Sequence, residues 1–75
     1  MTEEEAEALL KVSGLSWYYS FSHYEYWLVR SDDLDEGVRR DGAPVWVPNN
    51  THDVGPNKLA VFDAFIKGRG EWYDQ

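Results

Sequence analysis

The start of the chain carries the spacing of an amphipathic helix. Thr2 and Glu5 fit a capping box, in which each side chain bonds the backbone N–H of the other residue at a helix N-terminus. Apolar side chains follow at the i, i+3, i+4 spacing of a buried stripe: Ala6, Leu9 and Leu10. Gly14 suits the left-handed position that follows a helix end. The pattern predicts a helix over residues 3–12.

The following segment changes to a period of two, which is typical of a half-buried strand. Between residues 16 and 22, the aromatic side chains Trp17, Tyr19 and Phe21 alternate with serines, except that Tyr18 places a large ring on the serine face. Residues 24–30 are rich in aromatic and β-branched side chains, as strands are. A tight connection from Phe21 to Tyr24 would join the two strands into a hairpin.

A second hairpin is predicted further along the chain. Asp41-Gly42 is a dipeptide typical of hairpin turns, and short strands are expected on either side of it, over residues 38–40 and 43–47. Pro44 and Pro48 bracket the later strand. Because proline cannot donate a hydrogen bond to a neighbouring strand, they indicate an edge position.

The rest of the chain predicts loops and one more helix. Residues 31–37 and 48–55 are polar and read as loops. A broad apolar face predicts a helix over residues 57–67, and Gly68 is expected to end it. The tail, residues 69–75, carries two aromatic side chains and is expected to pack against the domain.

This order of elements indicates the α+β class. We expect a small single domain over residues 1–75, with an antiparallel β-sheet of 3–4 strands flanked on one face by an N-terminal and a C-terminal helix, in the order α-β-β-β-β-α. The core is expected between the sheet and the helices, from large apolar side chains: Trp17, Tyr19, Phe21, Trp27, Val29, Leu59, Phe62, Phe65 and Ile66.

Alternation along the strands then predicts a second, exposed face. The side chains sent to it are Tyr18, Tyr24, Tyr26 and Leu28. The helices of so small a domain cannot cover both faces, so a tyrosine-rich strip is expected to mark a contact site. The alternative is that this face is covered from within, by Trp46 or Trp72, or by a second copy of the chain.

Composition limits the chemistry open to the chain. It has 75 residues and no cysteine, which excludes disulfides and cysteine metal sites, and its two histidines form no metal cage. No cofactor is expected. The N-terminus lacks the basic and apolar regions of a secretory signal, and no apolar run could span a membrane, so a cytoplasmic location is expected, in the host cytoplasm if the chain is phage-encoded.

The formal net charge is −7, and it is concentrated in one half of the sequence. Residues 1–36 carry nine acids and two bases, whereas residues 37–75 carry five of each. An anionic chain is repelled by nucleic acid and by anionic membranes. We therefore expect no direct nucleic-acid or membrane partner, and we expect a basic protein surface instead.

Three patterns that could carry chemistry are weak. The acidic loop fails the EF-hand spacing, because position 12 counted from Asp33 is Pro44. His52-Asp53 or His23 could act as a base, but no glycine elbow surrounds any serine and no oxyanion-hole pattern is visible. Gly68-Arg69-Gly70 lacks the pattern of a phosphate loop and reads as a helix stop. An enzyme is not expected.

Small, cysteine-free, acidic and aromatic-rich domains resemble, in composition only, phage-encoded inhibitors of bacterial defence, including anti-CRISPR proteins and DNA-mimicking anti-restriction proteins. The resemblance implies a non-enzymatic inhibitor or decoy that blocks a basic, nucleic-acid-binding host protein. The partner-binding residues are expected to be acids and tyrosines of the first half: Glu3, Glu4, Glu7, Tyr18, Tyr24, Tyr26, Asp32, Asp33, Asp35 and Glu36. The alternative is a homodimeric interaction or assembly module, antitoxin-like or structural, so that the chain is a monomer or a homodimer.

Overall fold

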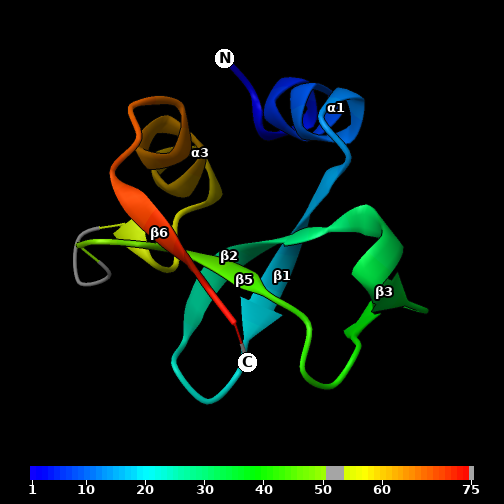
Figure 1. Ribbon diagram of the computed structural model, residues 1–75. Coiled ribbons are helices and arrows are strands. Elements are labelled where there is room, and N and C mark those ends of the chain that lie inside the picture. Colours follow the sequence, from blue (N-terminus) through cyan, green and yellow to red (C-terminus); the bar gives the residue numbers. More distant parts are fainter. Residues whose placement is uncertain (51–53, 75) are drawn as a thin grey trace.

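The structure, a computed structural model, describes residues 1–50 and 54–74. Its elements in chain order are α1 (Glu3–Val12), β1 (Leu15–Ser20), β2 (Glu25–Arg30), the 3₁₀ turn η1 (Ser31–Asp33), β3 (Leu34–Asp35), β4 (Val38–Arg39), β5 (Val45–Pro48), α3 (Lys58–Ile66) and β6 (Gly70–Tyr73). A four-stranded antiparallel sheet has the order β1-β2-β5-β6, and β3 and β4 form a separate two-stranded sheet (Figure 1). The predicted α+β class and the two flanking helices are confirmed.

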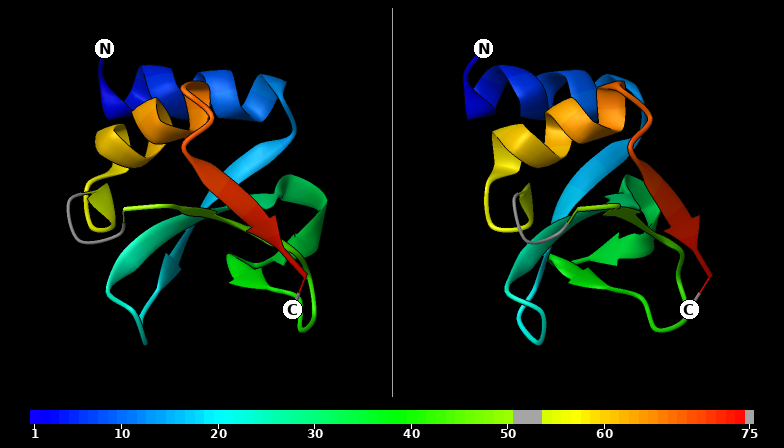
Figure 2. Two further views of the ribbon diagram at one scale, coloured as in Figure 1. Left: turned by 60° about the vertical axis from the view of Figure 1, so that its left-hand side comes forward. Right: turned by 90° about the vertical axis from the view of Figure 1, so that its left-hand side faces the viewer.

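Both helices lie over the same face of the sheet (Figure 2). α1 contacts β1 and α3, while α3 contacts β2 and β5. The predicted capping box is present: the Thr2 hydroxyl accepts from the Glu5 N–H at 3.1 Å, and the Glu5 carboxylate accepts from the Thr2 N–H at 2.9 Å. Gly14 follows α1 with φ at 75°, as predicted. In α3 the side chain of Asn57 accepts from the N–H of Ala60 and caps the helix.

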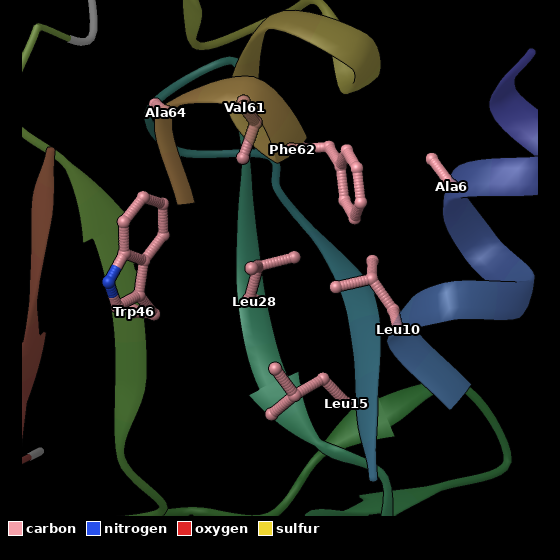
Figure 3. Packing of buried hydrophobic residues seen from close by; sticks show 8 residues of the cluster. All are labelled: Ala6, Leu10, Leu15, Leu28, Trp46, Val61, Phe62 and Ala64. Carbon is pink, nitrogen blue, oxygen red and sulfur yellow. The ribbon is translucent and has the colours of Figure 1, made fainter. Parts of the chain in front are cut away.

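The core fills the space between the helices and this face of the sheet (Figure 3). Eight buried side chains form one cluster: Ala6, Leu10, Leu15, Leu28, Trp46, Val61, Phe62 and Ala64. Phe62 points from α3 toward Ala6 of α1, so the two helices meet through these side chains (Figure 3). Two residues expected in the core, Phe21 and Ile66, are instead exposed, and the others lie at least partly buried.

The predicted face of β2 is wrong. β2 was expected to turn Trp27 and Val29 toward the helices, but Leu28 is the buried member of the main cluster. The register explains this, because Trp17 pairs with Leu28 and residues that pair directly across a ladder share a face. Both faces of β2 are apolar, so alternation within the strand alone could not choose between them.

The predicted second hairpin is also wrong. β4 pairs with β3 rather than with β5, and the turn between β3 and β4 has Glu36 and Gly37 at φ of 53° and 81°. Two successive positive φ values are those of a type I′ hairpin turn, which suits the twist of two short strands. Asp41-Gly42 instead forms a turn of its own, closed by a bond from the Ala43 N–H to the Arg40 carbonyl at 3.1 Å.

The tail joins the domain through backbone pairing while its two aromatic side chains, Trp72 and Tyr73, stay exposed, and it takes the edge position expected for β5. β6 pairs with β5 along its whole length, so β5 lies between β2 and β6. Pro48 ends β5, and the N–H of Tyr26 on β2 bonds the carbonyl of Gly55 instead of continuing the β2–β5 ladder. Pro44 and Pro48 therefore mark the ends of an interior strand, and the predicted edge position of this strand is wrong.

β6 can lie this close to β5 because residue 70 is a glycine. A Cβ at Gly70 would overlap the six-membered ring of Trp46, which is buried. Gly70→Ala is expected to lower the free energy of unfolding by about 1–3 kcal/mol, the usual cost of overpacking. The measurement is the urea midpoint followed by tryptophan fluorescence. Glu71→Ala, on the exposed neighbour, is the matched control, and equal midpoints for the two variants would contradict the prediction.

The capping box makes stability depend on pH in a defined direction. The Thr2 backbone N–H, and then its hydroxyl, hold the pKa of Glu5 below its ordinary value. A carboxyl whose pKa is lower in the folded chain stabilises the fold above the unfolded pKa, and this stabilisation is lost as the pH falls through the folded pKa.

Wild type is therefore expected to be more stable than Glu5→Gln at neutral pH, and the difference should shrink on acidification below roughly pH 4, where glutamates become protonated. Urea unfolding at neutral pH and at a pH below roughly 4 measures this difference in the free energy of unfolding. Glu4→Gln is the control, because Glu4 lies outside the capping box. A gap between wild type and Glu5→Gln that is constant with pH would show that the carboxylate charge plays no part.

Candidate protein-binding surface

The carboxylates of this chain are largely free to meet a partner. Among the residues that the structure describes, one ion pair is present, at 3.0 Å between Asp63 of α3 and Lys67, the residue that caps the C-terminal end of this helix. All the acids of the first half are exposed except Asp33, which is half-buried, and Glu25, which is buried. Their charge is therefore screened only by solvent and salt.

Most of the uneven charge along the sequence is also uneven in space, although β4 pairing brings Arg39 and Arg40 of the neutral half beside the acids of η1 and β3. The sheet order β1-β2-β5-β6 puts the two strands of the acidic half on one side and the two strands of the neutral half on the other. α1 lies at β1, within the acidic half, whereas α3 lies across the division and contacts both β2 and β5. In Figure 1, α1 and β3 lie to the right, whereas α3 and β6 lie to the left.

The predicted acids form two groups within this half. Glu3, Glu4 and Glu7 lie on α1, a helix of 10 residues that spans about 15 Å. The second group lies on η1 and the β3–β4 hairpin: Asp32, Asp33, Asp35 and Glu36. The C-terminal end of α1 is joined to η1, since the Ser31 N–H bonds the Gly14 carbonyl at 2.8 Å. The structure thus links the two groups through one end of α1.

The predicted tyrosine strip is wrong. Tyr18 and Tyr26 lie on opposite faces of the sheet, because Tyr18 pairs with Trp27 and Tyr26 pairs with Tyr19. Tyr26 is half-buried on the helix side, where the Lys58 ammonium lies 5.1 Å from its ring centre. Tyr24 is exposed in the β1–β2 turn, with φ at 56°. The three rings therefore share no surface.

The β3–β4 hairpin contacts the face that was expected to be open. The Arg39 guanidinium lies 5.6 Å from the ring centre of Tyr18, and its Nη1 donates to the Ala43 carbonyl at 2.7 Å. Its Nε is buried and has no hydrogen-bond partner within the described part of the chain. Val29 and Val45 are fully buried on this second face. A cation over an aromatic ring thus anchors an acidic hairpin to the sheet.

A groove remains between the hairpin and β1. It has a volume of about 310 Å³ and is lined by Trp17, Tyr18, Tyr19, Phe21, Gly37 and Val38. Sequence analysis missed the contribution of the hairpin, because the turn was assigned to Asp41-Gly42. The available signal was the glycine at residue 37, which suits the second central position of a type I′ turn.

A serine–histidine cluster closes the β1–β2 turn. His23 Nδ1 lies 3.0 Å from the hydroxyls of both Ser20 and Ser22, and its ring lies 5.0 Å from that of Trp27. The buried Glu25 carboxylate accepts from the Trp27 indole N–H at 3.1 Å. Both hydroxyls compete for one ring nitrogen, and Glu25 bonds the tryptophan, so these contacts fix the turn.

The other candidates for chemistry add little. A hollow of about 440 Å³ lies between α3 and the residues after β5, and its acid Asp63 is already paired with Lys67. His52 and Asp53, which the sequence suggested as a weak base and orienter, lie outside the described residues. Within residues 1–50 and 54–74 no three metal-ligating side chains come together, and no described helix could cross a membrane.

Comparison with protein-family models, with curated proteins and with solved structures finds no match to this chain.

The anchoring of the hairpin by Arg39 can be tested with its neighbour as a control. Arg39→Ala is expected to lower the free energy of unfolding by about 1–2 kcal/mol, because it removes a packed stem and leaves the Ala43 carbonyl without its donor. Arg40→Ala removes the same charge from an exposed side chain and should stay within about 0.5 kcal/mol of wild type. Urea unfolding measures both, and a loss of equal size in the two variants would assign the effect to charge alone.

Proposed function

We propose that this chain is a non-enzymatic protein that binds the basic surface of a nucleic-acid-handling protein and blocks it. The observation that supports this most is the half of the fold that bears α1, η1 and the β3–β4 hairpin, where exposed carboxylates lack ion-pair partners among the described residues. A one-sided anionic surface attracts a basic partner over several ångströms and orients it on approach.

A nucleic-acid-binding partner suits this surface because such proteins present clustered lysines and arginines to phosphates. The acids lie along α1 and along η1 and β3, so they form a series of separated charges rather than one compact cluster. The resemblance in composition to phage-encoded inhibitors of bacterial defence favours a host protein as the target. The serine–histidine cluster does not favour an enzyme, because Ser20 and Ser22 meet the same nitrogen of His23, and the nearby Glu25 carboxylate bonds the Trp27 indole instead of orienting the histidine.

A homodimeric assembly module is the second candidate. The free edge of β1 and the exposed ring of Phe21 beside it favour it, since uncovered strand edges pair readily. The acids of the neighbouring hairpin oppose it, because a second copy would bring like charges together.

The proposal predicts that the acids of η1 and β3 carry binding energy. The combined variant Asp32→Asn, Asp33→Asn and Asp35→Asn should bind the partner about tenfold more weakly, if each exposed pair is worth roughly 0.2–1 kcal/mol. The partner is first captured from bacterial lysate on the immobilised chain and identified by mass spectrometry. Added duplex DNA must release this partner from the immobilised chain. The affinity of the purified partner for the chain is then measured at low and at high salt.

A control of equal charge change comes from the other half of the chain: Asp63→Asn, Glu71→Gln and Asp74→Asn. It should bind within about twofold of wild type, because long-range attraction alone is strongly screened by salt. Both variants must unfold at the urea midpoint of wild type. An affinity that does not change with salt, or equal weakening in the two variants, would contradict the proposal.

A further inference from the structure

β1 is a free edge of the sheet, and its register shows which backbone groups are unused. The Ser31 N–H bonds the Gly14 carbonyl, which makes residues 14 and 31 a hydrogen-bonded pair. Such pairs alternate along an antiparallel ladder, so Ser16, Tyr18 and Ser20 bond β2. The N–H and C=O groups of Trp17 and Tyr19 therefore point away from the sheet. Within the described residues, no other strand or loop bonds this side of β1.

Apolar side chains flank this edge without being buried. Phe21, at the end of β1, is 81 % exposed, and Val38, on the hairpin, is 68 % exposed. Together with Tyr19 and Gly37 they line the groove of about 310 Å³. Natural proteins usually protect a strand edge with charge, proline or a covering segment. Here the edge is six residues long and contains neither charge nor proline.

The charge beside the groove selects its occupant. Asp35 and Glu36 are exposed at the hairpin turn, next to Gly37 and Val38 of the groove wall. No base lies between residues 31 and 38, and the next one, Arg39, is half-buried over the ring of Tyr18 with its Nη1 bonded to the Ala43 carbonyl, so the exposed charge at the turn itself is negative. A second copy of this chain would bring its own acids to the same place, whereas a basic segment would meet opposite charge.

We propose that the groove along β1 binds an extended, basic segment of the partner as an added strand. The backbone of Trp17 and Tyr19 would bond the segment, alternate apolar side chains would contact Phe21 and Val38, and lysines or arginines would lie near Asp35 and Glu36. This is strand addition at a sheet edge, in which main-chain bonds supply affinity and alternate side chains supply specificity. The inference rests on the proposed function and names the part of the partner that is bound.

The first test measures backbone protection with a defined probe. The probe is a capped peptide of alternating lysine and valine, as long as the six residues of β1. Amide exchange followed by NMR should show fast exchange at Trp17 and Tyr19 in the free chain and slow exchange at Tyr18. Adding the peptide should slow Trp17 and Tyr19. Control peptides in which glutamate replaces lysine, or glycine replaces valine, should leave the amide exchange of Trp17 and Tyr19 unchanged.

The second test uses exposed apolar residues with matched controls. Phe21→Ser with Val38→Ser should weaken binding of the lysine–valine peptide about tenfold or more, as for central interface residues, with little change in the urea midpoint. Val12→Ser with Ile66→Ser changes side chains that are 88 % and 65 % exposed on the helices, and should leave peptide binding unchanged.

The outcomes separate this inference from the proposed function. Suppose that the variant with Phe21→Ser and Val38→Ser still binds the partner that duplex DNA releases, whereas the variant with three aspartates replaced does not. The edge site is then wrong and the proposed function stands. If the peptide protects Trp17 and Tyr19 but no captured protein is released by DNA, the edge site stands and the proposed function is wrong. Sedimentation that shows a dimer dependent on Phe21 and Val38 would assign the edge to a second copy and overturn the basic occupant.

Discussion

The two halves of this protein are joined in the sheet at one residue pair, Leu28 with Trp46. Trp46 is buried there, its ring lies 5.1 Å from that of Phe65 on α3, and Gly70 leaves room for it on β6. One side chain therefore positions a strand on each side of β5 and the helix above it. A chain of 75 residues has a small core, so a ring that contacts three elements has a large share of its apolar burial.

This arrangement keeps the acidic half and the neutral half of the chain apart. β1 and β2 form one local hairpin, β5 and β6 form another ladder, and each half has its own helix. Because the strands of the two halves do not interleave in the four-stranded sheet, most of the uneven sequence becomes an uneven surface. Folds in which early and late strands interleave would mix the same charges. The proposed binding of a basic surface depends on this separation.

The aromatic segment has a different role from the one its composition suggests. Its rings form a network of contacts with one another, including Trp17 with Tyr26 and Tyr19 with Tyr26. The face away from the helices is contacted by a short acidic hairpin, which Arg39 holds against Tyr18. What stays open is the edge of β1 and not a face of the sheet. Specific contacts are therefore expected from backbone groups and flanking apolar side chains rather than from a tyrosine strip.

The sequence by itself determined the features that depend on neighbouring residues. The capping box of Thr2 and Glu5, the bounds of α1, the approximate bounds of α3 and the α+β class all follow from interactions over a few residues, or from periodicity within one element. The first hairpin followed as well, since its turn lies between adjacent strands. The location of the acids on α1 and on the segment 31–36 could be read in the same way.

Only the tertiary structure decided what depends on distant partners. The face of β2 was set by its register with β1, and the interior place of β5 was set by a tail that pairs with it. β4 paired with β3 instead of β5 because Glu36 and Gly37 adopt positive φ, while Asp41-Gly42 turns without closing a ladder. The groove of Phe21 and Val38 joins two such segments. Its existence depends on cross-strand pairing, which local propensity and alternation do not specify.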